Sequence, residues 1–277
     1  MNVRAHAKIN LSLAVRGVRP DGFHELRTVF QSLALHDTLR FGEADEGLTI
    51  ACSVPGIPLD ERNLVWKAAQ LVWAAAGRRG EPCGRVRISK RIPAQGGLGG
   101  GSADAAAALV GWNQVWATKL PAERLRDLAQ GLGADVPFML WGGTALGLER
   151  GDDVHPLDDA PSRWVVLVFP PFGVSTPDAF EWWDTDQDRQ PQADPPAVFN
   201  ALEAPVSRRH PELIEIRRAL ESAGASAAAM TGSGSTVFGL FDTRLAARAA
   251  CDRLTTAGWR SLITRTASRL QAGLLVG

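Results

Sequence analysis

A glycine-rich stretch in the first half of the chain limits the possible folds more than any other feature. Residues 93–108 read PAQGGLGGGSADAAAA, and only Leu98 interrupts the five glycines. Glycine allows positive φ and lets backbone N–H groups approach a ligand without interference from a Cβ atom. Ser102 and Asp104, residue types favoured at helix N-caps, lead into an alanine run of high helix propensity. A bare loop that opens onto a helix N-terminus is typical of a phosphate site.

The same stretch also suits a flexible turn before an ordinary helix, and two familiar phosphate motifs do not match it. The Walker motif requires Lys after its last glycine, whereas Ser102 follows Gly101. The dinucleotide motif requires a further glycine at Ser102, a strand that leads directly into the loop, and an acidic residue on a second strand. In this chain residues 90–95 separate the expected strand from the glycines. The acidic residue at the required distance, Glu123, lies in a helical pattern and not on a strand. We therefore expect a phosphate loop of another kind.

Size and charge narrow the classes of function. The 277 residues suggest roughly two domains with a sizeable core. Thirty basic and 30 acidic residues cancel, so no global field favours nucleic acid or an anionic membrane. The three cysteines lack a C-x-x-C spacing and are expected to be core thiols rather than disulfide or zinc ligands. Without a secretion signal or an apolar run near the roughly 20 residues of a membrane span, we expect a cytoplasmic protein.

The N-terminal segment predicts a strand that carries two polar side chains on one face. Residues 3–15 alternate in part between apolar and polar positions, which places Lys8 and Asn10 together. The pattern alone favours an exposed edge strand. Lysine is scarce beside arginine in this chain, and this draws attention to Lys8 and Lys90 as compact point charges.

A Pro-Asp-Gly turn follows, and two short strands are expected over residues 24–35 and 37–41. Phe23 and His24 come directly after the turn. The pair suits the buried start of a strand, which the pattern slightly favours, or a loop edge where an aromatic ring and an imidazole hold a base.

Helical spacing is expected over residues 63–76, a strand over 85–89, and a helix from Ser102 to about residue 116. Asp135 lies in LGADVPFML, between a glycine and a proline at the boundary of an element. An acid in that position is most often a helix N-cap.

Residues 155–163 are rich in turn-forming types and mark the expected domain boundary. The second region mixes strands and helices, with a helix over 175–183, a polar mobile loop over 184–196 and a helical pattern over 197–202. Residues 231–235 (TGSGS) form a second glycine loop, which suits either phosphate donors or a hairpin turn.

Five stretches together resemble the GHMP small-molecule kinases across the whole chain. They are AKINLSLAV, RPDGFHEL, KRIPAQGGLGGGSADAAAAL, LGADVPF and MTGSGSTVFG, in the family's order and spacing. The resemblance is sharpest to the branch that acts on diphosphocytidyl-methylerythritol in the non-mevalonate isoprenoid pathway. It implies ATP-dependent phosphorylation of the substrate's C2 hydroxyl, with Mg²⁺.

The resemblance also implies an α+β fold of two domains. The N-terminal one, residues 1–155, would be like the second domain of ribosomal protein S5, and the C-terminal one, residues 156–277, would be ferredoxin-like. The substrates would meet in a cleft between them. The sequence defines neither an oligomeric state nor a protein-borne metal ligand.

By motif, the resemblance assigns three groups of site residues. Lys8 and Asp135 form the catalytic pair. The ATP site comprises Asn63, Lys90, Pro93, Ala94, Gln95, Gly96, Gly97, Leu98, Gly99, Gly100, Gly101, Ser102 and Ala103. The diphosphocytidyl-methylerythritol site comprises Asn10, Phe23, His24, Thr176 and Phe180.

These roles agree with the chemistry of phosphoryl transfer, which needs positioning and charge neutralisation. Asp135 would accept the hydroxyl proton, and Lys8 would stabilise developing charge and keep that acid ionised. Phe23 and Phe180 would sandwich cytosine while His24 contacts its polar edge. Ser102 is a candidate contact of the metal ion, which would otherwise rely on phosphates and water.

One position departs from the family pattern. The family commonly has Tyr where this chain has Phe23, and the chain contains no tyrosine. A phenyl ring keeps the stacking face but cannot make a hydroxyl hydrogen bond.

Two rival functions share the same motifs. Another GHMP substrate, such as homoserine or mevalonate, carries no base for the DGFHEL segment to hold. A non-catalytic nucleotide sensor would be expected to lack the equivalents of Lys8 or Asp135, and both are present.

Overall fold

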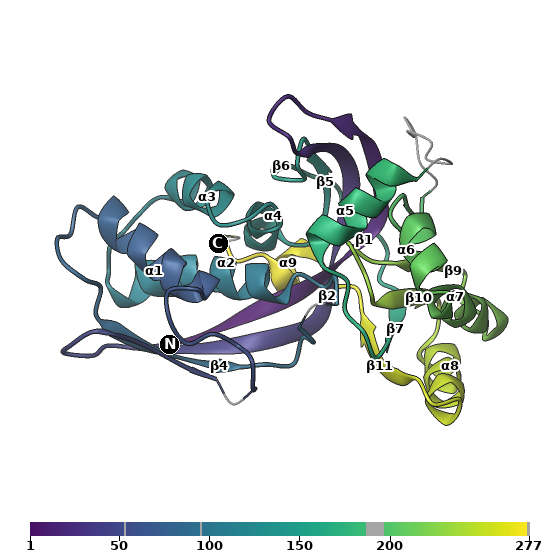
Figure 1. Ribbon diagram of the computed structural model, residues 1–277. Helices are drawn as coiled ribbons and strands as arrows, with labels where there is room; N and C mark the ends of the chain where they lie inside the picture. The colour runs from purple at the N-terminus through teal and green to yellow at the C-terminus, as the bar shows by residue number, and fades with distance from the viewer. Residues whose placement is uncertain (53, 95, 187–196, 276–277) are drawn as a thin grey trace.

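The structure is a computed structural model, and it describes residues 1–52, 54–94, 96–186 and 197–275. Two β-sheets lie side by side in this part of the chain, and helices cover a face of each (Figure 1). The first sheet has the strand order β3-β4-β2-β1-β8, with β5 beside β2 and β6 beside β5. Its strands are β1 (Asn2–Val18), β2 (His24–Gly42), β3 (Leu48–Cys52), β4 (Gly84–Ser89), β5 (Thr144–Leu148), β6 (Asp153–Pro156) and β8 (Phe199–Asn200).

Strands β1 and β2 form a long antiparallel hairpin that runs through the first sheet. The two short strands expected over residues 24–35 and 37–41 are one strand, so that prediction is wrong. The pairing register shifts between His6, opposite His36, and Lys8, opposite Ser32. An irregularity of this kind bends a strand without ending it. The edge expected for β1 is also wrong, because β2 and β8 pair with it on either side.

Helices α1 (Leu64–Ala75), α2 (Gly100–Val115), α3 (Ala122–Gln130) and α4 (Val136–Trp141) accompany the first sheet. Helix α2 is central to this layer, since ten consecutive residues from Ala103 to Trp112 are buried. Alanine and glycine allow α2 to approach β1, β2 and α1 closely, and the larger Trp112 packs edge-on against Phe41. The core of this layer therefore rests on the helix that begins at the glycine loop.

The second sheet has the order β11-β7-β10-β9 and only antiparallel pairs. Its elements follow as β7 (Trp164–Phe169), α7 (Glu212–Ser222), β9 (Ala227–Met230), β10 (Val237–Phe241), α8 (Arg244–Thr256) and β11 (Arg260–Arg265). This β-α-β-β-α-β sequence is the ferredoxin-like arrangement. The α+β class and the ferredoxin-like second unit are as expected.

Between β7 and α7 the chain returns to the first sheet. Helix α5 (Thr176–Thr185) leads to β8, which pairs parallel with β1 at Ser12 and Leu13, and α6 (Glu203–Arg209) follows. The helical pattern expected over residues 197–202 is wrong, because pairing with β1 overrides the local preference. Most of the loop expected over 184–196 lies outside the described residues. The domain boundary at residue 155 stays a prediction.

A short helix, α9 (Arg269–Ala272), closes the described chain. Among the described residues, each helix is too short or too polar to traverse a lipid bilayer.

Candidate active site

A cavity of about 1540 Å³ lies where the two sheets meet. Its walls come from β1, the glycine loop before α2, the start of α5 and the TGSGS loop before β10. A pocket for one drug-sized ligand is about 300–1,000 Å³. The cavity therefore has room for two ligands side by side.

The glycine loop ends in the N-cap of α2 at Gly99, whose φ of 69° is left-handed. Helix α2 thus begins at Gly100, two residues before the expected start, and Ser102 lies in its first turn. Alanine at Gly99 would be strained by its φ, and its Cβ would lie 2.4 Å from Met139 Cε. The free N–H groups of the first turn face the cavity end of the helix, where an anion is stabilised.

The two glycine loops touch each other. A Cβ atom on Gly97 would lie 2.1 Å from the carbonyl oxygen of Thr231, and Thr231 Oγ1 lies 3.4 Å from the carbonyl oxygen of Gly97. The main-chain N–H of Lys8 donates to the carbonyl oxygen of Leu98 at 3.1 Å. The loops from both halves of the chain are therefore held against β1.

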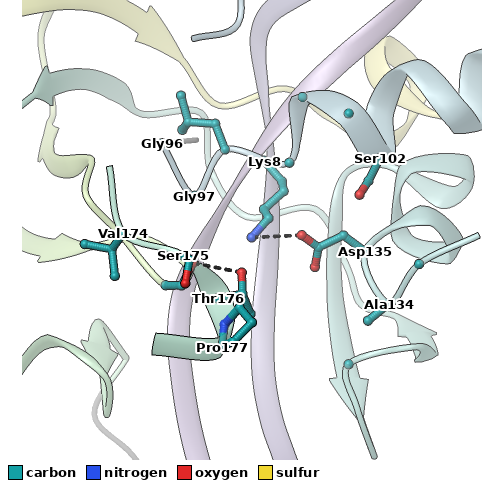
Figure 2. A pocket seen from close by; sticks show the side chains of 18 of the residues that line it. Lys8, Gly96, Gly97, Ser102, Ala134, Asp135, Val174, Ser175, Thr176 and Pro177 are labelled. Carbon is teal, nitrogen blue, oxygen red and sulfur yellow. Dashed lines mark hydrogen bonds and ion pairs between the residues drawn. The ribbon is translucent and has the colours of Figure 1, made fainter. Parts of the chain in front are cut away.

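Lys8 and Asp135 form an ion pair at the cavity wall (Figure 2). Lys8 Nζ lies 3.3 Å from Asp135 Oδ2; the lysine side chain is 3% exposed and the aspartate side chain 31%. Asp135 occupies the N-cap position of α4, yet its side chain makes no capping hydrogen bond. Its carboxylate is therefore available to the cavity, and its catalytic role stays a prediction.

Asn10 holds Lys8 in place. Its Oδ1 accepts a hydrogen bond from Lys8 Nζ at 2.7 Å, and its Nδ2 donates to Thr28 Oγ1 at 2.7 Å. Its main-chain N–H donates to Thr231 Oγ1 at 3.0 Å. Since both ends of the buried amide have protein partners, the structure gives Asn10 a positioning contact. Its contact with substrate stays a prediction.

Lys90 lies beneath the glycine loop between two buried acids. Its Nζ is 2.5 Å from Asp37 Oδ2 and 2.8 Å from Asp104 Oδ2. Asp37 Oδ1 also accepts the main-chain N–H groups of Arg91 and Ile92, at 2.5 and 2.9 Å. These bonds tie β2 to the entry of the loop and to α2.

The charges of this buried cluster are coupled. Burial raises the pKa of Asp104 to about 7, and nearby Asp37 adds to the rise while Lys90 opposes it. Burial lowers the pKa of Lys90, but attraction to Asp104 and Asp37 outweighs it, so the net shift is upward. One ammonium between two acids favours a proton on one of them. Asp104 is the acid whose pKa is raised, and its Oδ1 has no hydrogen-bond partner in the described structure.

Asn63 is the N-cap of α1. Its Oδ1 accepts the N–H of Val65 at 3.0 Å and its Nδ2 donates to the carbonyl oxygen of Pro58 at 2.6 Å. The residue lines the cavity, so a contact with the nucleoside stays a prediction.

The expected base site is partly assembled. His24 stacks on Phe180 with ring centroids 4.5 Å apart, whereas the guanidinium of Arg150 lies 5.1 Å from the ring of Phe23. Phe23 is 55% exposed, so the core placement that the pattern slightly favoured is wrong. The imidazole of His24 covers one face of the Phe180 ring, so that face is not open to a base. The sandwich of cytosine between Phe23 and Phe180 stays a prediction.

The cavity brings together most of the site residues expected from the sequence. Thr176 Oγ1 lies 3.2 Å from Ser233 Oγ, which joins α5 to the TGSGS loop. Ala103 is buried inside α2 and does not line the cavity, and Gln95 lies outside the described residues. The cavity is lined by Lys8, Asn10, Phe23, His24, Asn63, Lys90, Pro93, Ala94, Gly96, Gly97, Leu98, Gly99, Gly100, Gly101, Ser102, Asp135, Thr176 and Phe180.

Two family models and several relatives match this arrangement. The GHMP kinases N terminal domain matches residues 63–143, and the GHMP kinases C terminal domain matches residues 191–260. A relative from Pelotomaculum thermopropionicum is 43% identical over 95% of this chain and 96% of its own length. The chain belongs to the GHMP kinase family. That relative is named 4-diphosphocytidyl-2-C-methyl-D-erythritol kinase, as is one from Nocardia farcinica that is 42% identical over 96% of this chain and 92% of its own.

Solved structures place this GHMP kinase in the same fold. A crystal structure of 4-(cytidine 5'-diphospho)-2C-methyl-D-erythritol kinase matches with a TM-score of 0.83 at 34% identity, over 97% of this chain and all of that one. Mevalonate kinase from Methanococcus jannaschii matches with a TM-score of 0.73 at 10% identity, over 97% of this chain and 98% of that one. The latter shows the fold alone. The resemblance and the two-domain GHMP fold expected from the sequence are confirmed, and as a member of this family the chain uses ATP.

Proposed function

We propose that this chain transfers the γ-phosphoryl group of ATP to the C2 hydroxyl of 4-diphosphocytidyl-2-C-methyl-D-erythritol, a step in non-mevalonate isoprenoid precursor synthesis. The Lys8–Asp135 pair, set between the glycine loop and α5, is the observation that carries the chemistry. The names of the full-length relatives support the substrate. The cytoplasm stays the predicted location.

In this proposal the glycine loop and the first turn of α2 bind the triphosphate through backbone N–H groups. Asp135 accepts the proton of the attacking hydroxyl, which requires hydrogen-bond reach of that oxygen. Lys8 stabilises the negative charge that develops on the transferred group, and Asn10 keeps its ammonium directed toward Asp135. The buried position of Lys8 strengthens these interactions, because water does not screen them.

We propose Mg²⁺ as the metal ion. Among the described residues, no three His, Cys, Asp or Glu side chains gather in a way that could hold a metal. The residues fit a magnesium ion held chiefly by nucleotide phosphates and water, with the Ser102 hydroxyl as a candidate protein contact. When bound, the ion would neutralise charge on the phosphates.

The other half of the cavity would hold the diphosphocytidyl-methylerythritol. Thr176, Phe180, His24 and Phe23 line this half, and an aromatic surface suits a base. Homoserine and mevalonate have no such group, so this surface argues against them. The presence of both Lys8 and Asp135 argues against a sensor that binds nucleotide without catalysis.

The test is ATP turnover by the purified protein with Mg²⁺ and four acceptors: diphosphocytidyl-methylerythritol, its uridine analogue, homoserine and mevalonate. Phosphorylation of the cytidine compound alone is expected. Turnover of homoserine or mevalonate would support the assignment as a kinase and contradict the proposed substrate. Tight ATP binding with no turnover of any acceptor would point to the sensor.

A further inference from the structure

One face of helix α5 holds the imidazole of His24. Phe180, Trp183 and Asp184 are spaced i, i+3 and i+4, so they share a side of the helix. Phe180 stacks on the imidazole at 4.5 Å, and Trp183 meets it edge-on, with centroids 5.7 Å apart and planes at 89°. Asp184 Oδ1 lies 2.9 Å from His24 Nε2. The ring is therefore fixed in both position and rotation, and the His24 side chain is only 11% exposed.

The contact with Asp184 decides which ring nitrogen carries the proton. An ionised carboxylate can only accept a hydrogen bond, so Nε2 of His24 must donate to Asp184. In a neutral imidazole the other nitrogen, Nδ1, is then an acceptor. No hydrogen bond between described residues engages Nδ1 of His24, while the residue lines the cavity. The nitrogen that remains for a ligand is an acceptor.

An acceptor in this place distinguishes the two pyrimidines of ribonucleotides. Cytosine carries an exocyclic amine, a donor, where a uracil-type base carries a carbonyl acceptor. Nδ1 of His24 can accept a hydrogen bond from the amine of cytosine. With uracil, Nδ1 and the carbonyl oxygen would both be acceptors, and no hydrogen bond could form between them. A buried polar group left unpaired is the strongest basis for rejecting a similar ligand.

We propose that Asp184 is a positioning residue that fixes the Nε2–H form of His24 and thereby sets the preference for cytosine over uracil. This inference rests on the proposed function, because it assumes a substrate that carries a cytosine. Asp184 itself need not touch the substrate. Its role is to set the hydrogen-bonding polarity of the ring that does.

The test compares Asp184→Asn with the wild type at about pH 8. An asparagine amide can accept from Nε2 or donate to it, so the variant allows both forms of His24. The ratio of kcat/KM for diphosphocytidyl-methylerythritol to that for its uridine analogue is expected to fall roughly tenfold or more. The KM for ATP is expected to stay unchanged. Asp252→Asn is the control, since Asp252 is an exposed acid on α8 that does not line the cavity, and it should keep the wild-type ratio.

Nitrogen-15 NMR of the histidine rings provides a readout that does not depend on turnover. The wild type should show the Nε2–H form at His24, and Asp184→Asn should show a mixture. An Nδ1–H form in the wild type, or an unchanged cytidine-to-uridine ratio in Asp184→Asn, would overturn the inference. If the wild type phosphorylates neither compound, the proposed substrate is wrong, and affinities for CDP and UDP then decide: equal binding would overturn the role of Asp184.

Discussion

Lys8 Nζ lies 3.3 Å from Asp135 Oδ2, although the two residues come from a central strand and from the start of a short helix more than a hundred positions later. The lysine is buried and the acid faces the cavity. The pair is thus placed for the two roles that we propose, a proton acceptor and a fixed positive charge.

Asp135→Asn tests the proton acceptor. The amide keeps the size of the side chain but cannot take a proton, so kcat is expected to fall roughly 10²-fold or more. Nucleotide affinity, measured by calorimetry, should change little. Asp127→Asn, which alters an exposed acid on the neighbouring helix α3, is the control and should keep full activity. Unchanged turnover in Asp135→Asn would remove this residue from the mechanism.

Lys8 should tolerate neither loss of charge nor a larger cation. Lys8→Met keeps the stem and removes the ammonium, and we expect kcat to fall roughly 10²-fold or more. Lys8→Arg should be equally poor, because the buried Nζ lies 2.7 Å from Asn10 Oδ1 and 3.3 Å from Asp135 Oδ2, and the longer, planar guanidinium does not reproduce that compact charge. Lys67→Met, at an exposed site on α1, serves as control. Recovery of activity by Lys8→Arg would contradict this account of the packing.

The sequence predicts the parts of the site that local chemistry marks. Glycines before an alanine-rich helix predict a phosphate loop, and that loop lines the cavity. The motif around Asp135 predicts an acid of the site despite its N-cap position, and this acid lies beside Lys8. The alternation around Lys8 correctly predicts a strand. It cannot show that β8, from the other half of the chain, pairs with the same strand at Ser12 and Leu13.

Long-range partners are what the sequence cannot supply. Asp104 suits a helix cap by type, yet it pairs with Lys90, and Asp37 joins them from a strand more than fifty positions away. The position of Asp37 among the apolar residues of 33–41 is the one sequence feature that could have indicated a buried, paired acid. Asp184 fell at the start of an expected loop, and only the extension of α5 to Thr185 turns it toward His24.

Gly97→Ala should separate the two glycine loops. The new Cβ would meet the main-chain carbonyl of Thr231 at 2.1 Å, and a φ of +72° disfavours any side chain. We expect a loss of about 2 kcal/mol or more in the free energy of unfolding, together with weaker ATP binding.

Gly101→Ala is the stability control for that substitution. No atom lies within 4 Å of its would-be Cβ, and the position is helical, so the melting temperature should stay or rise. Equal stability of Gly97→Ala and the wild type in chemical denaturation would contradict the close contact between Gly97 and the Thr231 carbonyl oxygen.

Phe23→Ala should weaken binding of the cytidine substrate while ATP affinity stays unaltered. The ring is 55% exposed, so its removal should cost little stability. Stacking of one base on an aromatic side chain contributes about 1–3 kcal/mol, so KM is expected to rise roughly fivefold or more. Phe23→Tyr keeps the stacking face and should retain the wild-type KM. A loss confined to ATP affinity would contradict the stacking role.

Asp104 should make the stability of the protein depend on pH. The pKa of an aspartate in the unfolded chain is about 4, whereas burial raises the pKa of Asp104 to about 7 in the folded state. Between these pH values the folded protein holds a proton that the unfolded chain has released. The contribution of this residue to the free energy of unfolding therefore falls as pH rises from about 4 to about 7.

Asp104→Asn removes that dependence, because an amide does not titrate and Lys90 keeps Asp37 as its partner. Urea unfolding at about pH 5 and pH 8 should show the variant gaining about 1 kcal/mol or more relative to the wild type at the higher pH. Asp252→Asn, at an exposed acid on α8, should show no such change between the two pH values. A difference between Asp104→Asn and the wild type that stays constant with pH would mean that Asp104 is ionised throughout, and that Lys90 neutralises both of its buried neighbours.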